Sequence, residues 1–305
     1  MYIGIDVGGT NVVCSFFDKN FVHLKSVKYK TPIDLYSDFL TKIVSSVKQL
    51  ENTFNVVDSI GIALPGFHKN EVIHCANIPS INQKKLICDL ENLLKKKIFF
   101  DNDANCFSLS ESTLLKKSEN ETQEHISLGI TIGTGIGVGI IIDNKIIHGR
   151  NKICSEFAHQ SIPIDAFEIL GNKLPKFKCG CGKYNCIETF VSGTGLSNLY
   201  YEKVNKRFEA SDIYRLSLEK DTNAQKVMEQ YIELLCICLS NLILTLDPDE
   251  IIVGGGVSNM NGILEALVNN IPNYLLNNME MPKIKKAIFE NSGSRGAALL
   301  CVQGN

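Results

Sequence analysis

Three cysteines stand close together in the run KCGCGKYNCIE. Cys179, Cys181 and Cys186 follow the pattern C-x-C-x4-C. Thiolates at this spacing can bind one Zn²⁺ ion, and His159 is the candidate for the remaining ligand of a tetrahedral site. The alternatives are a redox pair, or a chance cluster in a chain with 11 cysteines. We favour a closed structural zinc site, which does not itself activate water.

Two aspartates flank an asparagine in the run DNDAN. Asp101, Asn102 and Asp103 lie where a short apolar strand is expected to pass into a helix. Residues of these types also cap helix N-termini, which is the alternative interpretation for either aspartate. A carboxylate at this position suits phosphoryl transfer to an alcohol, because that reaction needs a base beside the attacking hydroxyl.

Three glycine clusters each follow an apolar, β-branched segment. They are Gly8-Gly9-Thr10, Gly133 to Gly137, and Gly254 to Gly256. Glycine adopts positive φ and lets a phosphate approach the backbone N–H groups closely. A single cluster is most simply a tight turn. Three clusters, each at the end of a strand, favour binding of nucleotide phosphates.

The two common nucleotide-binding motifs do not account for these glycines. The P-loop pattern GxxxxGK[ST] is absent, since Gly182-Lys183 is followed by Tyr184. The alternating glycines of 133–139 do not match GxGxxG at the start of a helix. A P-loop or Rossmann domain is therefore disfavoured.

The elements that must position these groups alternate between strand and helix. Strands are expected at 3–7, 56–64, 98–101, 126–142, 250–254 and 284–289, and helices at 34–50, 84–96, from 103, and at 223–246, 260–270 and 293–302. This alternation indicates an α/β fold. The segments IGIDVGGT and GITIGTGIG repeat one strand-to-turn unit, which indicates two related halves facing a cleft. The polar stretch 115–125 is the expected hinge or linker.

Length and composition exclude several classes of protein. The 305 residues, 44% hydrophobic and 21% charged, fit two globular domains. A net charge of −2 gives no bulk attraction to nucleic acid or anionic membranes. No apolar run reaches the ~20 residues that span a bilayer, and MYIGIDVGGT is not a signal peptide. We therefore expect a cytoplasmic protein without disulfides.

Three segments together resemble the actin-like ATPase superfamily: Asp6 before the first glycine turn, the GTGIG turn, and DPDEIIVGGG. Within it, IGIDVGGTN and CxCGxxxC are similar to the ROK family of sugar kinases and repressors, and the resemblance covers essentially the whole chain. It implies a two-domain actin-like (ribonuclease-H-like) α/β fold with an interdomain cleft. Residues 1–118, joined by the C-terminal helix 291–305, would form the smaller domain, and 119–290 the larger, zinc-binding one.

The same resemblance implies roles for individual residues. Asp103 matches the family's catalytic base. The family's ExGH motif is present with Ala158 in place of its glycine. The implied sugar-binding residues are Gly66, Asn77, Asn102, Asp103, Glu156, His159 and Glu188. The implied ATP-binding residues are Gly4, Ile5, Asp6, Val7, Gly8, Gly9, Thr10, Asn11, Gly133, Thr134, Gly135, Ile136, Gly137, Gly139, Gly255 and Gly256. His159 would thus serve both the zinc ion and the sugar.

The activity implied by the resemblance is transfer of the γ-phosphoryl group of Mg-ATP to the 6-hydroxyl of N-acetylglucosamine, in amino-sugar salvage. ATP, Mg²⁺ and a structural Zn²⁺ are the expected cofactors. Glucose, mannose, fructose and N-acetylmannosamine are alternative acceptors.

Two other classes of function are disfavoured. A ROK repressor needs a helix-turn-helix ahead of the first phosphate turn, and only two residues precede Ile3. A catalytically inactive sugar sensor would not need Asp103. The expected partners are the sugar and ATP, not nucleic acid or a membrane, and the expected assembly is a homodimer.

Overall fold

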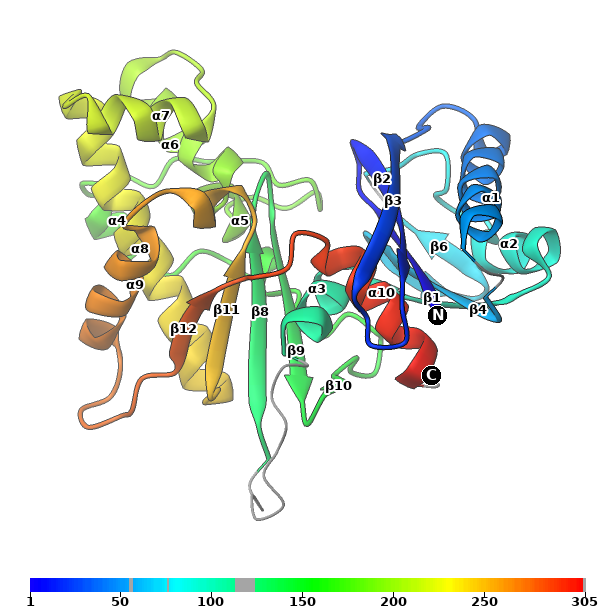
Figure 1. The fold of residues 1–305 in the computed structure, drawn as a ribbon. Helices are drawn as coiled ribbons and strands as arrows, with labels where there is room; N and C mark the ends of the chain where they lie inside the picture. The colour runs from blue at the N-terminus through cyan, green and yellow to red at the C-terminus, as the bar shows by residue number, and fades with distance from the viewer. Residues whose placement is uncertain (55–56, 76, 113–123, 304–305) are drawn as a thin grey trace. The chain divides into compact units, whose positions relative to one another are not determined.

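The computed structural model describes residues 1–54, 57–75, 77–112 and 124–303 (Figure 1). The chain divides into two compact units. Unit 1 contains Met1–Thr122, Gly139–Cys154 and Ile288–Asn305, and unit 2 contains Gln123–Val138 and Ser155–Ala287. The hinge predicted at 115–125 lies outside the described residues, apart from Glu124 and His125.

Unit 1 is built on a sheet with the strand order β3-β2-β1-β4-β7. Its strands are β1 (Tyr2–Val7), β2 (Asn11–Phe17), β3 (His23–Lys30), β4 (Ser59–Leu64) and β7 (Lys97–Asn102). The first three form an antiparallel meander, whereas β1, β4 and β7 run parallel. The carboxyl ends of β1, β4 and β7 therefore lie at one edge of the sheet, where ligands bind in open α/β sheets.

Helices cover the sheet of unit 1. They are α1 (Tyr36–Thr53), α2 (Leu86–Leu94), α3 (Asp103–Ser112) and α10 (Ser292–Gln303), and a small hairpin is made by β5 (Phe67–Lys69) and β6 (Val72–His74). The apolar stripe of α1, including Phe39, Ile43 and Val47, packs in one core cluster with Ile3 and Ile5 of β1. The C-terminal helix α10, red in Figure 1, packs against β1, β4 and α3.

Glycines allow α10 to approach the sheet this closely. A Cβ at Gly61 of β4 would overlap the carbonyl group of Ala297 in α10. We expect Gly61→Ala to lower the free energy of unfolding by about 3 kcal/mol, because overpacking at a backbone contact cannot be relieved by a side-chain rotation. Thermal unfolding measures the effect. The matched control is Gly256→Ala, whose added Cβ meets nothing within 4 Å and which should change the stability by less than about 0.5 kcal/mol.

The second sheet has the strand order β10-β9-β8-β11-β12. Its strands are β8 (Ile126–Ile132), β9 (Ile136–Ile142), β10 (Lys145–Ile146), β11 (Glu250–Gly254) and β12 (Lys283–Lys286). Strand β11 runs parallel to both β8 and β12, and Gly254 pairs with Thr131. The glycine turns that follow β8 and β11 therefore lie side by side at one edge.

Unit 2 contains α4 (Ala166–Ile169), α5 (Glu188–Val191), α6 (Gly193–Val204), α7 (Ala210–Leu218), α8 (Thr222–Leu246) and α9 (Ile263–Asn270), with 3-10 turns at Phe157–His159, Gly256–Asn259 and Ile271–Tyr274. Helix α8 begins at the capping side chain of Asp221 and ends at Asp247, which has a positive φ of 44°. By length and composition alone, α8 is apolar enough to cross a membrane. However, 67% of its most apolar window is buried inside the protein, which indicates a core helix.

The domain boundaries expected from the sequence differ from these units most at one segment, and by at most four residues at the other two boundaries. Residues 139–154, expected in the larger domain, belong to unit 1. The reason is packing: Gly139 lies against Ala104 and Ser108 of α3, and Ile141 and Ile146 join a core cluster with residues of α3 and α10. Strand β9 thus passes from unit 2 into unit 1 between Val138 and Gly139.

Candidate functional site

The polar groups of unit 1 gather where its parallel strands end. Asp6 lies near the end of β1, and Asp103 is the first residue of α3, directly after β7. The Asn102 side-chain amide donates to the Gly66 carbonyl oxygen (3.3 Å), and the backbone N–H of Ala104 donates to both Asn102 Oδ1 (2.9 Å) and Asp103 Oδ1 (3.0 Å). Gly66, Asn102 and Asp103 are therefore close together.

Gly66 and Asn77, both predicted to contact the sugar, lie in the same unit. Gly66 has a φ of +99°, and a Cβ there would overlap the carbonyl of His74, so this turn requires glycine. Asn77 is exposed and lies beside the first glycine turn. A Cβ atom added at Gly9 would be 3.9 Å from the backbone oxygen of Asn77.

Burial shapes the acid–base chemistry of the two aspartates. Loss of hydration raises the pKa of Asp103 above its ordinary value, and the same effect, assisted by the negative charge of Asp103, raises the pKa of Asp6 to about 6. A carboxylate with a raised pKa is a stronger proton acceptor. Two neighbouring carboxylates also favour a cation, and oxygen ligands are those that Mg²⁺ prefers. Asp6 is thus the residue of unit 1 that suits Mg²⁺.

The first glycine turn presents its backbone rather than its side chains. Gly8 N–H donates to the Asn11 carbonyl (2.9 Å), and Thr31 Oγ1 donates to the Gly8 carbonyl (2.6 Å), while Gly9 and Thr10 are exposed. Of the residues predicted to bind ATP, Ile5 and Val7 have fully buried side chains and Gly4 is packed against α10. The segment available for a nucleotide is therefore Gly8–Asn11 and the Asp6 carboxylate.

The other predicted phosphate turns lie in unit 2. Gly133 and Thr134 accept hydrogen bonds from the N–H groups of Gly193 (2.7 Å) and Thr194 (3.3 Å), so the start of α6 holds the turn in place. Gly255, with a φ of +83°, packs against the Ile132 backbone at the end of β8. Sequence reasoning missed Gly193 and Thr194, although Ser192 as an N-cap before Gly-Thr-Gly is a signal for a helix start there.

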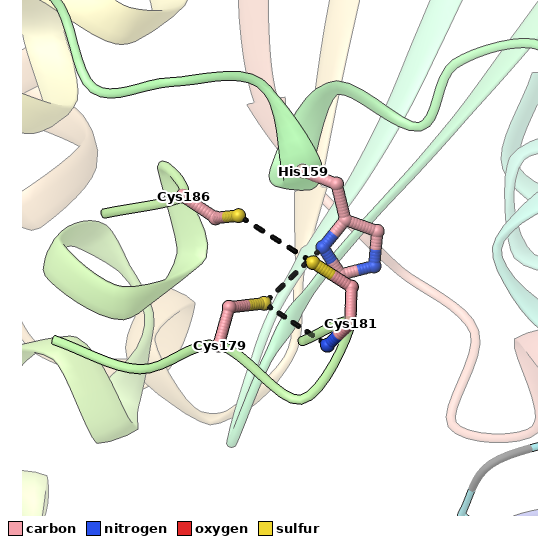
Figure 2. Close-up of side chains that lie close together, drawn as sticks. All are labelled: His159, Cys179, Cys181 and Cys186. Carbon is pink, nitrogen blue, oxygen red and sulfur yellow. Dashed lines mark hydrogen bonds between the residues drawn. The ribbon is translucent and has the colours of Figure 1, made fainter. Parts of the chain in front are cut away.

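The cysteine cluster assembles as predicted. His159, Cys179, Cys181 and Cys186 each place one ligand atom within 4.8 Å of the others (Figure 2). The Sγ atoms of Cys181 and Cys186 are 3.6 Å apart, and Cys179 Sγ is 3.5 Å from His159 Nδ1. Ligands of a tetrahedral zinc site with bonds of about 2.3 Å stand about 3.8 Å from one another. The donor set and the spacing therefore fit Zn²⁺.

Glu188, at the start of α5, connects this cluster to the glycine turn of unit 2. Its Oε1 accepts from the Cys179 thiol (2.8 Å) and lies 3.6 Å from His159 Nδ1. Its Oε2 is 3.1 Å from where a Gly135 Cβ would stand. The other nitrogen of His159, Nε2, lies 3.7 Å from Glu156 Oε2. The predicted sugar contacts Glu156, His159 and Glu188 thus form one group within unit 2.

Comparison with known proteins agrees with this fold. The chain belongs to the ROK family, which matches residues 2–304, and it has the actin-like ATPase fold of that family. An N-acetyl-D-glucosamine kinase of Citrobacter koseri is 36% identical, covering 98% of this chain and 99% of the relative.

Solved structures are similar over the full length. A ROK hexokinase from Thermus thermophilus has a TM-score of 0.83 at 26% identity and covers 100% of this chain and 99% of its own. A ROK glucokinase from Streptomyces griseus, solved with glucose and AMPPNP, has a TM-score of 0.79 at 24% identity and covers 99% of each chain.

Proposed function

We propose that this ATP-dependent sugar kinase of the ROK family phosphorylates the 6-hydroxyl of N-acetylglucosamine. The observation that carries the proposal is the half-buried Asp103, at the strand edge beside Asp6 and Gly66, in a chain that is 36% identical to N-acetyl-D-glucosamine kinases along 98% of its length. Glucose is the alternative acceptor, because the fold is also similar to those of a ROK hexokinase and a ROK glucokinase.

In the proposed mechanism, Asp103 accepts the proton of the 6-hydroxyl as the sugar oxygen attacks the γ-phosphorus. The bond between the γ-phosphorus and the bridging oxygen breaks, and ADP leaves. Backbone N–H groups of the glycine turns bind the phosphate oxygens. Asp6 would hold Mg²⁺, and the ion would supply positive charge to the phosphates.

The remaining polar groups orient the sugar. Hydroxyls both donate and accept hydrogen bonds, so the Glu156 and Glu188 carboxylates, which lie together in unit 2, fix them in direction. His159 would bind Zn²⁺ through Nδ1, the nitrogen that faces Cys179, and a sugar hydroxyl through Nε2. The metal would then stiffen one side of the sugar site without taking part in the transfer.

Two further properties belong to the same proposal. The need for ATP and the many free thiols support a cytoplasmic location. A homodimer is the proposed assembly, and sedimentation equilibrium would give the mass of two chains.

The direct test is identification of the product. The protein is incubated with Mg-ATP and N-acetylglucosamine, and a ¹H–³¹P correlation spectrum is recorded. The proposal requires a phosphorus nucleus coupled to the two protons on C6. A phosphate on another carbon, or no sugar-dependent release of ADP with any hexose or N-acetylhexosamine, would refute it.

The pH dependence of the rate follows from the raised pKa of Asp103. Because Asp103 must be ionised to accept a proton and its pKa is raised, kcat should fall with decreasing pH at a higher pH than an ordinary aspartate would produce. Initial rates would be measured from pH 4.5 to pH 9 at saturating Mg-ATP and sugar. They should show the fall of kcat at low pH. A rate that stays constant down to pH 4.5 would contradict this assignment.

A further inference from the structure

His148 makes a short contact with the strand-to-helix junction that carries Asp103. It lies just beyond β10, where its backbone oxygen accepts from Cys154 N–H (3.0 Å). Its Nε2 donates to Asp101 Oδ2 (2.6 Å), with 30% of the His148 side chain and 9% of the Asp101 side chain exposed. Both residues belong to unit 1.

The other oxygen of Asp101 holds the junction on both sides. Oδ1 accepts from the backbone N–H of Asn102 (2.7 Å), the last residue of β7, and from the side-chain amide of Asn105 (2.8 Å) in the first turn of α3. Between these two anchors lies Asp103, and Asn102 itself bonds to Gly66. Asp101 thus fixes the backbone that carries the candidate base and one sugar contact.

We propose that His148 is a positioning residue: through its hydrogen bond to Asp101, it sets the orientation of Asn102 and Asp103 for the transfer. This inference rests on the proposed function. A buried carboxylate needs a donor for each oxygen, and His148 supplies the one for Oδ2. Without it, the charge of Asp101 is left partly unpaired and the junction is free to shift. Misplacement of a reacting group by about 1 Å can cost 10²-fold in rate.

His148 is also reachable from solvent. It lines a cavity of about 390 Å³ with Gly66, His68, Phe100, Asn102 and Lys152. The charged and titratable groups that face it are Asp101, Lys152 on its own loop, and His68 of β5. The bond to Asp101 raises the pKa of His148, against opposing effects of burial and of Lys152. The hydrogen bond between protonated His148 and Asp101 is therefore strongest at low pH. It weakens as the pH rises through the raised pKa of His148.

The test compares two substitutions at His148. His148→Ala removes the donor, and we expect kcat to fall about tenfold or more and the sugar KM to rise, with the KM for ATP within about twofold of wild type. His148→Gln keeps an N–H donor at a similar reach, and we expect it to retain most of the activity. The control is His68→Gln, in the same cavity, whose ring packs edge-on against Phe100 at 4.9 Å.

Two further readouts separate positioning from general stability. Added imidazole should partly restore His148→Ala, since the cavity would admit the lost ring. The decline of wild-type kcat at high pH should be absent in His148→Gln, which does not titrate. The inference would be overturned if His148→Ala kept the wild-type kcat and sugar KM, or if its kcat fell while the KM values for sugar and ATP stayed unchanged. It would also be overturned if His148→Ala and His148→Gln lost kcat equally, or if imidazole restored no activity to His148→Ala.

Failure of the proposed function is distinguishable from failure of this inference. The imidazole pKa of His148, followed by NMR, requires no activity. It should lie above the ordinary histidine value in the wild type and fall in Asp101→Asn. An inactive wild-type protein with this titration would refute the kinase assignment alone, whereas an active protein in which Asp101→Asn leaves the titration unchanged would refute the link between His148 and Asp101.

Discussion

Replacing Asp103 by asparagine should lower kcat by about 10²–10⁴-fold, the usual contribution of a general base. Asparagine has nearly the same shape and keeps an oxygen that can accept from Ala104 N–H, as Asp103 Oδ1 does now. The helix start should therefore persist, and the KM values for sugar and ATP should change little. The measurement is steady-state kinetics with N-acetylglucosamine and Mg-ATP, with the exposed Asp34→Asn of the same unit as the control.

The stability of the same variant separates a lost base from a misfolded protein. The pKa of Asp103 is raised in the folded state, so the ionised carboxylate is disfavoured there, and folding stability declines as pH rises through that folded value. At neutral pH, Asp103→Asn should thus be at least as stable as the wild type. A variant with near wild-type kcat would remove Asp103 from the mechanism. A variant with a lower unfolding temperature would show that the carboxylate has a structural role instead.

Loss of the zinc site should have the second-largest effect. Cys181→Ser should release the metal, lower the unfolding temperature and raise the sugar KM about ten- to hundredfold, a range typical for disturbed metal surroundings. The reason is that His159 and Glu188 are arranged around the same sulfur atom, Cys179 Sγ. The KM for ATP should change less. Metal analysis by mass spectrometry and kinetics with both substrates measure the three effects.

The matched control is Cys88→Ser, which alters an exposed thiol on α2 in unit 1, outside the cluster. It should keep one zinc per chain and the wild-type sugar KM. Zinc that is absent from the purified wild-type protein, or that remains bound when Cys179, Cys181 and Cys186 are all replaced, would show that the metal centre is wrongly assigned.

Much of the fold was predictable because its elements have strong local signals. The stripe Phe39, Ile43 and Val47 predicted the helix that forms as α1, and the apolar 223–246 segment with Asp247-Pro248 behind it predicted α8 to within one residue. The assignment of residues 139–154 to unit 1 was not predictable in this way. It depends on Gly139 meeting α3, a contact between segments far apart in the sequence.

The candidate site was predictable where its functional residues lie close together in the sequence. The C-x-C-x4-C run and the DNDAN run contain their candidate functional groups within a few residues. The structure brings the three cysteines together with His159. Gly4, Ile5 and Val7 were predicted to bind ATP. Only the structure shows that the side chains of Ile5 and Val7 are buried in the core and that Gly4 packs against α10. His148 carried no motif, because its bond to Asp101 joins residues 47 positions apart.

The identity of the acceptor sugar is the central claim, and one comparison tests it most directly. N-acetylglucosamine differs from glucose in one acetamido group, so the specificity of the site is the ratio of the two kcat/KM values. We predict a ratio of at least about tenfold in favour of N-acetylglucosamine, or roughly 1.4 kcal/mol of differential transition-state binding. Equal or higher kcat/KM for glucose, mannose or N-acetylmannosamine in the same coupled assay would contradict the assignment of N-acetylglucosamine as the substrate.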